Sequence, residues 1–198
     1  QCGNLDGTRE IWQEIARIAE GKFAAIDQSG GMVAIASPYD EELSKLSRDL
    51  NSTYVAYGSE GGRMREAQAA NDRDAETRAP ASAAERAASK AGGLYRNESW
   101  DLVDAVNNKN VELDKLKPSD LPEDLRTMDT KQQREYLEQK SKDRQQLQAK
   151  IQDLSKRRDA YVDGKLKESG KKTDSAFDAQ VLNTLKEQGQ KKGITFEK

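Results

Sequence analysis

The chain has 198 residues, a formal net charge of −2, and equal shares of charged and hydrophobic residues at 34% each. An ordinary domain has about 25% charged and 45–50% apolar residues, so this composition excludes one large hydrophobic core. There is no histidine and a single cysteine, Cys2, which excludes histidine-based catalysis, histidine metal sites and an internal disulfide. No apolar run approaches the length of about 18 residues that indicates a membrane span.

The chain opens with a predicted amphipathic helix over residues 8–20. Ile11, Trp12, Ile15 and Ile18 recur at helical spacing and give the helix a broad apolar face. Thr8 can cap its start, and Gly21 can end it. Such a helix needs a sheet to cover, and we expect at least a partial sheet in this region. We therefore expect Trp12 and Ile15 to be core anchors.

Extended patterns follow this helix. The apolar runs 22–26 and 32–36 are separated by turn residues and predict a hairpin, in which Phe23 would be a further core anchor. A helix over about 39–50 and a short strand over 53–57 complete the first part. The pattern predicts a mixed α/β region over residues 1–58.

The remainder reads as helical. Alanine and charged residues dominate 59–93 and predict two exposed helices and a linker. Residues 94–198 predict a mainly α-helical extension with Trp100 as a core anchor. Its longest element is a polar helix over about 129–169, and Asp129 with Gln132 forms a capping-box pattern at its start.

The long helix carries a short apolar seam. Its members follow a 4-3-7 spacing and form a candidate partner face: Leu147, Ile151, Leu154 and Tyr161. Arg158 and Arg144 interrupt this seam, which has about two heptads where a coiled coil needs three or four. We expect a monomer whose long helix packs on neighbours in its own chain, near Leu102 and Val106 and near Val181 and Leu185. The alternative is a coiled-coil adaptor that dimerises through 147–161.

No constellation predicts chemistry. The acidic run 40–42 lies in the first turn of a helix, where negative charge suits the helix dipole. The basic run 156–158 is typical of a solvated face and lacks the aromatic platform of a nucleic-acid site. The glycine pairs match no phosphate-binding loop. We expect no catalytic residue, no cofactor, no metal ligand and no nucleic-acid partner.

The order of signals near the N-terminus resembles one known family. Three successive stretches resemble the closing half of a von Willebrand factor A domain. They are Cys2-Gly3-Asn4, then Ile11-Trp12-Gln13-Glu14-Ile15-Ala16-Arg17, then Glu20-Gly21-Lys22-Phe23. The resemblance covers about residues 1–52, and the downstream stretches resemble the C-terminal extension of bacterial proteins with such a domain. It implies adhesion or protein–protein interaction.

The metal site of that family starts with D-x-S-x-S, and no such motif occurs here. No metal residue is therefore transferred to this chain, and Mg²⁺ is implied only for an intact parent protein. The compartment would be periplasmic or extracellular if that parent carries a signal peptide.

The sequence thus predicts a non-enzymatic binding or scaffold protein, the C-terminal part of a von Willebrand A-domain protein with an unidentified protein partner. The coiled-coil adaptor is the first alternative. An enzyme is the least favoured one, because no nucleophile–base pair can be assembled.

Overall fold

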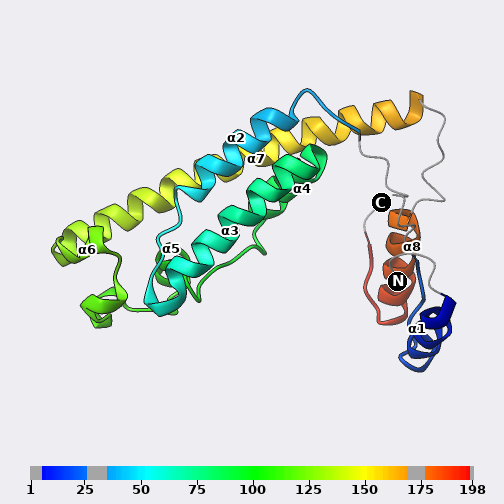
Figure 1. The fold of residues 1–198 in the computed structure, drawn as a ribbon, viewed down its shortest axis with the longest axis horizontal. Helices are drawn as coiled ribbons and strands as arrows, with labels where there is room; N and C mark the ends of the chain where they lie inside the picture. The colour runs from blue at the N-terminus through cyan, green and yellow to red at the C-terminus, as the bar shows by residue number, and fades with distance from the viewer. Residues whose placement is uncertain (1–5, 26–34, 169–176, 197–198) are drawn as a thin grey trace. The chain divides into compact units, whose positions relative to one another are not determined.

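The structure is a computed structural model that describes residues 6–25, 35–168 and 177–196. The chain divides into two compact units (Figure 1). The helical unit comprises residues 36–162, and the terminal unit comprises residues 1–35 and 163–198. The elements are α1 (Asp6–Ile18), α2 (Asp40–Asn51), α3 (Gly58–Arg78), α4 (Pro80–Lys90), α5 (Leu102–Asn107), the 3₁₀ turns η1 (Leu113–Lys115) and η2 (Pro118–Asp120), α6 (Glu123–Arg126), α7 (Thr130–Glu168) and α8 (Phe177–Lys191).

The predicted mixed α/β region with a partial sheet is wrong for the part of the chain that the structure describes. Residues 22–25 are not a strand, and 26–34 lie outside the described residues. The only β-type pairing among the described residues is an isolated bridge between Ala56 and Asp101. The extended segment 53–57 lies against the start of α5, where Leu102 N–H donates to Val55 O over 2.8 Å. Its apolar residues are therefore covered by helices, and no second strand is needed.

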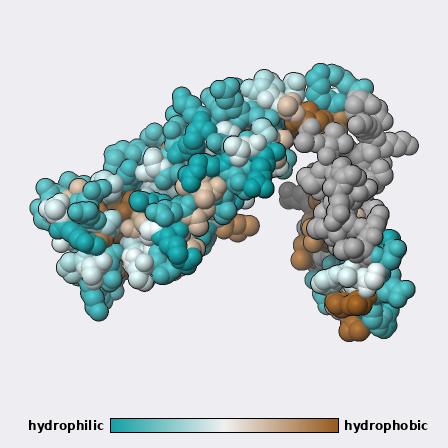
Figure 2. All heavy atoms as spheres, in the orientation of Figure 1, coloured by the Kyte–Doolittle hydropathy of each residue, from teal (hydrophilic) through white to brown (hydrophobic). Residues whose placement is uncertain are grey.

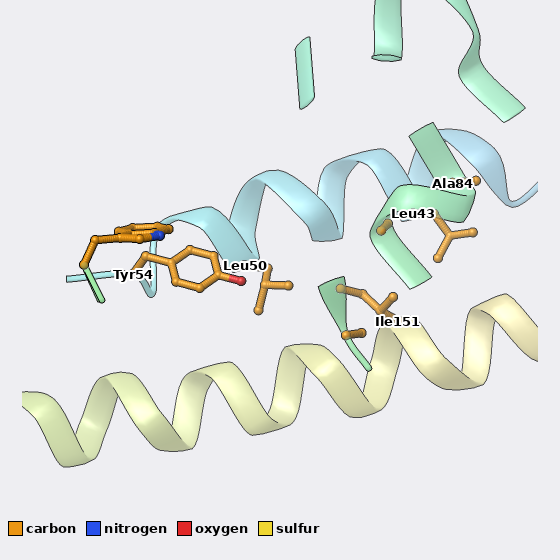
Figure 3. Packing of buried hydrophobic residues seen from close by; sticks show 8 residues of the cluster. Leu43, Leu50, Tyr54, Ala84 and Ile151 are labelled. Carbon is orange, nitrogen blue, oxygen red and sulfur yellow. The ribbon is translucent and has the colours of Figure 1, made fainter. Parts of the chain in front are cut away.

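The helical unit has its main core where α2, α4 and α7 meet. Leu43, Ser47 and Leu50 lie one or two turns apart on α2 and are all buried, which is the pattern of one core-facing stripe. Figure 3 shows the α2 leucines facing Ala84 of α4 and Ile151 of α7. The buried members of this first cluster are Leu43, Leu50, Tyr54, Ala84, Ala87, Ala91, Trp100 and Ile151.

A second hydrophobic cluster covers the N-terminal part of α7. Short elements supply most of it: the buried members are Val55, Leu102, Val103, Leu113, Leu121, Leu125 and Leu137. Pro118 stands at the start of η2 and Pro122 precedes α6. The capping box at the start of α7 is present, because Gln132 N–H donates to Asp129 Oδ1 and Asp129 N–H donates to Gln132 Oε1.

The predicted exposure of the alanine-rich helices is wrong for α4. Ala83, Ala84, Ala87 and Lys90 are buried along one face of this helix. The absence of large side chains here does not mean the absence of a core, since alanine lets helix backbones approach closely. Pro80 occupies the first turn of α4, where its missing N–H costs nothing.

The seam of α7 is longer than the apolar residues suggest. Leu137, Arg144, Ile151 and Arg158 follow at intervals of seven residues, and all four are buried. Ile151 is 0% exposed, and Leu147 and Leu154 pack against the first cluster. The predicted docking of α7 within its own chain is therefore observed. Two of the expected neighbours are found: Leu102 shares the second cluster with Leu137, and Val106 packs against that cluster. Val181 and Leu185 belong to the terminal unit.

The terminal unit contains α1 and α8. An ion pair joins Lys22 to Glu187, next to a hydrogen bond from Gln188 Nε2 to Glu20 O. The chain after α8 folds back onto Gly189, where a Cβ atom would lie 2.6 Å from the ring of Phe196. None of the helices within the described residues combines the length and apolar character that crossing a membrane requires.

Candidate functional site

Charged side chains lie inside the core of the helical unit. Lys90, Arg144 and Arg158 are all buried, and each lies against at least one buried carboxylate. A buried charge is tolerated only when it is paired and hydrogen-bonded. These three groups are the natural candidates for a functional site, so we consider each of them in turn.

Lys90 is enclosed by oxygen atoms from α2 and α3. Its Nζ lies 2.6 Å from Asp72 Oδ2, 2.7 Å from Asn51 Oδ1, 3.0 Å from Ser47 Oγ and 3.4 Å from Ser47 O. The side chain is 0% exposed. On its other oxygen, Asp72 accepts a hydrogen bond from Arg86 Nε over 2.5 Å. This network, which we call the Lys90 network, joins α2, α3 and α4.

The two charges of the Lys90 network respond differently to burial. Burial lowers the pKa of Lys90, and its hydrogen bond to Asp72 offsets this only in part. Burial by itself would raise the pKa of Asp72. The hydrogen bonds from Lys90, Asn51 and Arg86 outweigh it, so that the pKa of Asp72 lies below its ordinary value. Asp72 therefore stays ionised at neutral pH.

This shift predicts acid sensitivity. The lowered pKa of Asp72 stabilises the fold fully above its ordinary value of 3.8, and this contribution is lost as the pH falls through the folded-state pKa. We expect the free energy of unfolding to fall between about pH 5 and pH 3, and to fall less in Asp72→Asn. Urea denaturation at both pH values measures the difference.

A matched control for this experiment is Asp153→Asn, which changes an exposed aspartate on α7. It should leave the pH dependence of the parent protein intact. Burial raises the pKa of Asp104. The contribution of Asp104 to stability therefore changes with pH in the opposite direction and favours the folded state at low pH. An unaltered pH dependence in Asp72→Asn would contradict the role given to this carboxylate.

Arg144 lies at the centre of a second network. Its Nη1 atom lies 2.6 Å from Asp101 Oδ2 and 2.6 Å from Asp104 Oδ1, and its Nη2 donates to Thr53 O over 2.7 Å. The guanidinium also lies 4.4 Å from the ring centroid of Tyr54, a cation–π distance. All the partners come from outside α7, so this arginine fixes α7 to the extended segment and to α5.

Asp101 is the buried counter-charge of Arg144. It caps the start of α5, since Asp104 N–H donates to its Oδ2, and its Oδ1 accepts the N–H of Val55 over 2.6 Å. Burial would lower the pKa of Arg144, but the bonds and charges of Asp101 and Asp104 outweigh it and raise that pKa. Arg144 thus keeps its charge in the core.

Arg158 forms the third site. Its Nε atom lies 2.8 Å from Asp40 Oδ1, and its Nη2 donates to Ala81 O of α4 over 3.2 Å. Glu85 lies farther away, at 3.7 Å, and is largely exposed. Asp40 also accepts hydrogen bonds from the backbone N–H and the hydroxyl of Ser37, just before α2.

These three sites hold the helices together. A general base must reach the proton that it abstracts, and Lys90 is fully enclosed with its donors satisfied. The cavity beside Asp72 and Arg86 measures only about 10 Å³, room for roughly one water molecule. Over the described ranges, no group of three or more histidine, cysteine, aspartate or glutamate side chains could hold a metal ion.

The predicted core anchors differ in how far they are buried in the structure. Trp100 is buried in the first cluster, and Phe23 is partly buried. Trp12 and Ile15 are 51% and 48% exposed, so neither is a core anchor in the structure. The reason is physical: within the described residues, the sheet that should cover this face of α1 is not formed.

The structure also changes the interpretation of the other predicted sites. Within the candidate partner face, Leu147, Ile151 and Leu154 are used inside the chain, and Tyr161 lies edge-on to Tyr39 at a centroid distance of 6.3 Å. The basic run 156–158 is not one solvated face, because Arg158 is buried against Asp40. Asp40 is likewise a buried ion-pair partner as well as a member of the acidic first turn of α2.

The sequence interpretation missed Lys90 and the pairing of both arginines. A signal for the arginines was available, since Arg144 and Arg158 continue the seven-residue spacing of Leu137 and Ile151. No comparable pattern points to Lys90, which ends an alanine-rich helix.

Among the described residues of the terminal unit, α1 has an uncovered apolar surface. The large apolar side chains on one face of α1 are about half exposed or more; they are Ile11, Trp12, Ile15 and Ile18. We call this surface the α1 face. Figure 2 shows hydrophobic side chains uncovered in the part of the chain that contains α1 and α8, whereas the visible face of the helical unit is mostly hydrophilic. A contiguous apolar patch of this kind is typical of an interaction site.

Comparisons with known proteins found no matching protein-family model, no matching curated protein and no matching solved structure.

Proposed function

We propose that the chain is a non-enzymatic binding or scaffold protein. In this proposal the α1 face contacts a protein surface, and the helical unit is a rigid spacing element. The observation that carries it is the exposure of Ile11, Trp12, Ile15 and Ile18 on one side of an amphipathic helix. Each buried apolar side chain of this size contributes about 1.5–3 kcal/mol, so a partner that covers the four would bind with substantial gain.

The charged groups of the helical unit support a structural role over an enzymatic one. The hydrogen bonds of the three buried basic side chains join helices to one another; these side chains are Lys90, Arg144 and Arg158. A unit held by three such networks resists deformation, because breaking any of them leaves an unpaired charge in the core. Resistance to deformation is what a spacer needs.

We infer further that residues 1–52 derive from a von Willebrand A domain, as their motifs suggest. The uncovered α1 face supports this inference, because the corresponding helix of that family covers a sheet. A sheet within this chain is not part of the proposal. Reading the coding sequence upstream of Gln1 tests the relation: a D-x-S-x-S motif is expected there, and an upstream sequence without it would count against the family.

The adaptor alternative has less support. Its dimer contact would require Ile151 and its neighbours to be available, and the core of the helical unit already covers them. We propose that α7 does not mediate dimerisation and that any partner binds at the α1 face.

Photo-crosslinking tests the proposed contact. A benzoylphenylalanine replaces Ile18 on the α1 face or, as the matched control, Gln13 on an exposed position of the same helix. In cells that naturally express the protein, we expect one crosslinked species from position 18, and its loss when Ile15→Glu is added. A buried or contacted apolar surface does not tolerate an unpaired charge. Equal crosslinking from both positions, or none from position 18, would contradict the proposal.

A further inference from the structure

The two ends of the helical unit meet at one place. The unit begins at residue 36 and ends at residue 162. Asp40, near its beginning, pairs with Arg158, near its end, across 118 residues of sequence. Tyr39 and Tyr161 form an edge-on ring contact next to this pair. The two points at which the chain enters and leaves the helical unit are therefore joined by an ion pair and an aromatic contact.

This junction is built from three helices. Arg158 belongs to α7, its carboxylate partner Asp40 begins α2, and its carbonyl partner Ala81 lies in the first turn of α4. The backbone N–H and hydroxyl of Ser37 hold the carboxylate of Asp40 in position, at 2.9 and 2.6 Å. From α7, the side chain of Arg158 thus forms hydrogen bonds to the beginnings of both α2 and α4.

The junction also lies at the edge of the core. Arg158 is the last buried residue of α7, and Asp40 is the first buried residue of α2. The apolar contacts of the first cluster, such as those of Leu43 and Ile151, lie further inside. Segments with few buried apolar contacts open locally at a lower free-energy cost than the whole unit does.

We propose that Asp40 and Arg158, with Tyr39 and Tyr161, form a latch that holds the entering and leaving segments of the helical unit together. When the latch is closed, both segments are fixed at one point. When it opens, the first turn of α2 and the last buried turns of α7 separate while the first cluster stays packed. The latch is a conformational device that sets whether the two connections move together or independently.

Hydrogen exchange of the full chain, read by mass spectrometry, tests the latch. The variant Arg158→Met keeps the length of the side chain but removes its charge. We expect amide exchange in residues 37–42, on the opposite side of the latch, to rise roughly 10- to 100-fold, the effect of losing a hydrogen bond to a charged group. Asp40→Ala should reciprocally raise exchange in residues 155–161. Peptides from α5 should be unchanged in both variants.

Two controls keep the test decisive. Arg157→Met removes the neighbouring exposed ion pair with Asp153 and should leave residues 37–42 unchanged. The double variant should exchange no faster than the single variants, because both remove the same latch. Equal acceleration in α5 would show that Arg158 acts on global unfolding, and the absence of the cross-effect would show that the two segments are not coupled; either result overturns the proposal.

Discussion

Replacing Arg144 by methionine is expected to lower the free energy of unfolding of the helical unit by about 3–5 kcal/mol, the cost of removing one partner from a buried ion pair. The substitution leaves the carboxylate of Asp101 at 0% exposure with only the backbone N–H groups of Val55 and Asp104 as donors. It also removes the hydrogen bonds that tie α7 to Thr53. Urea denaturation followed by circular dichroism measures the loss.

The matched control for Arg144→Met is Arg157→Met, on the same helix. Arg157 pairs with Asp153 at the surface, and exposed pairs of this kind contribute about 0–1 kcal/mol. The double variant Arg144→Met with Asp101→Asn should recover part of the loss, because it no longer leaves a buried charge unpaired. Equal effects of Arg144→Met and Arg157→Met would show that the Arg144 network does not stabilise the fold.

Ile151→Lys is expected to unfold the helical unit. Ile151 is 0% exposed between α2, α4 and α7, and an unpaired ammonium at such a position costs far more than the burial of the isoleucine contributes. We expect the cooperative unfolding transition to be lost or shifted by at least about 4 kcal/mol, which is an exceptional size for one substitution. Thermal denaturation followed by circular dichroism provides the measurement.

The control for this substitution is Ala149→Lys, which places the same charge on an exposed position of α7. Surface changes of this kind usually alter stability by less than about 0.5 kcal/mol. A folded Ile151→Lys protein with an unchanged transition would show that Ile151 is not part of the core.

The sequence predicts the longest element well. The capping pattern of Asp129 with Gln132 gives the start of α7 to within one residue, and the predicted helix over about 129–169 compares with Thr130–Glu168 in the structure. These features are local: a cap and a run of good helix formers depend on neighbours in sequence. The docking of the α7 seam within the chain also follows from counting its apolar residues.

The predicted strands fail for a different reason. Residues 53–57 are β-branched and aromatic, which indicates burial as much as strand formation. Their burial comes from α5 and α7: Val55 pairs with the start of α5, and Tyr54 lies under Arg144. Sequence reasoning found the segment that needs covering but not what covers it.

The buried ion pairs could not be assigned from one sequence. In the sequence, Arg144 and Arg158 interrupt an apolar seam, and arginine is rarely buried. Their partners Asp101 and Asp40 lie 43 and 118 residues away, and no local pattern connects them. The chain offers 35 acidic residues as candidate partners, so pairing is a property of the three-dimensional fold. The heptad spacing locates the arginines but not their counter-charges.

The exposure of the α1 face likewise could not be predicted from the sequence. The apolar spacing of Ile11, Trp12, Ile15 and Ile18 indicates that the face is to be covered. It does not say whether the cover lies in this chain. The structure leaves the face open, and this is the observation from which the binding role is proposed.

Sedimentation equilibrium at tens of micromolar separates a scaffold whose α7 seam is internal from an adaptor that dimerises through residues 147–161. With Ile151 and its neighbours covered inside the helical unit, too little apolar surface remains on α7 to offset the cost of association. We expect that the chain does not dimerise through this seam and that the Ile151→Lys variant unfolds. A stable dimer that Ile151→Lys dissociates into folded monomers would contradict this expectation.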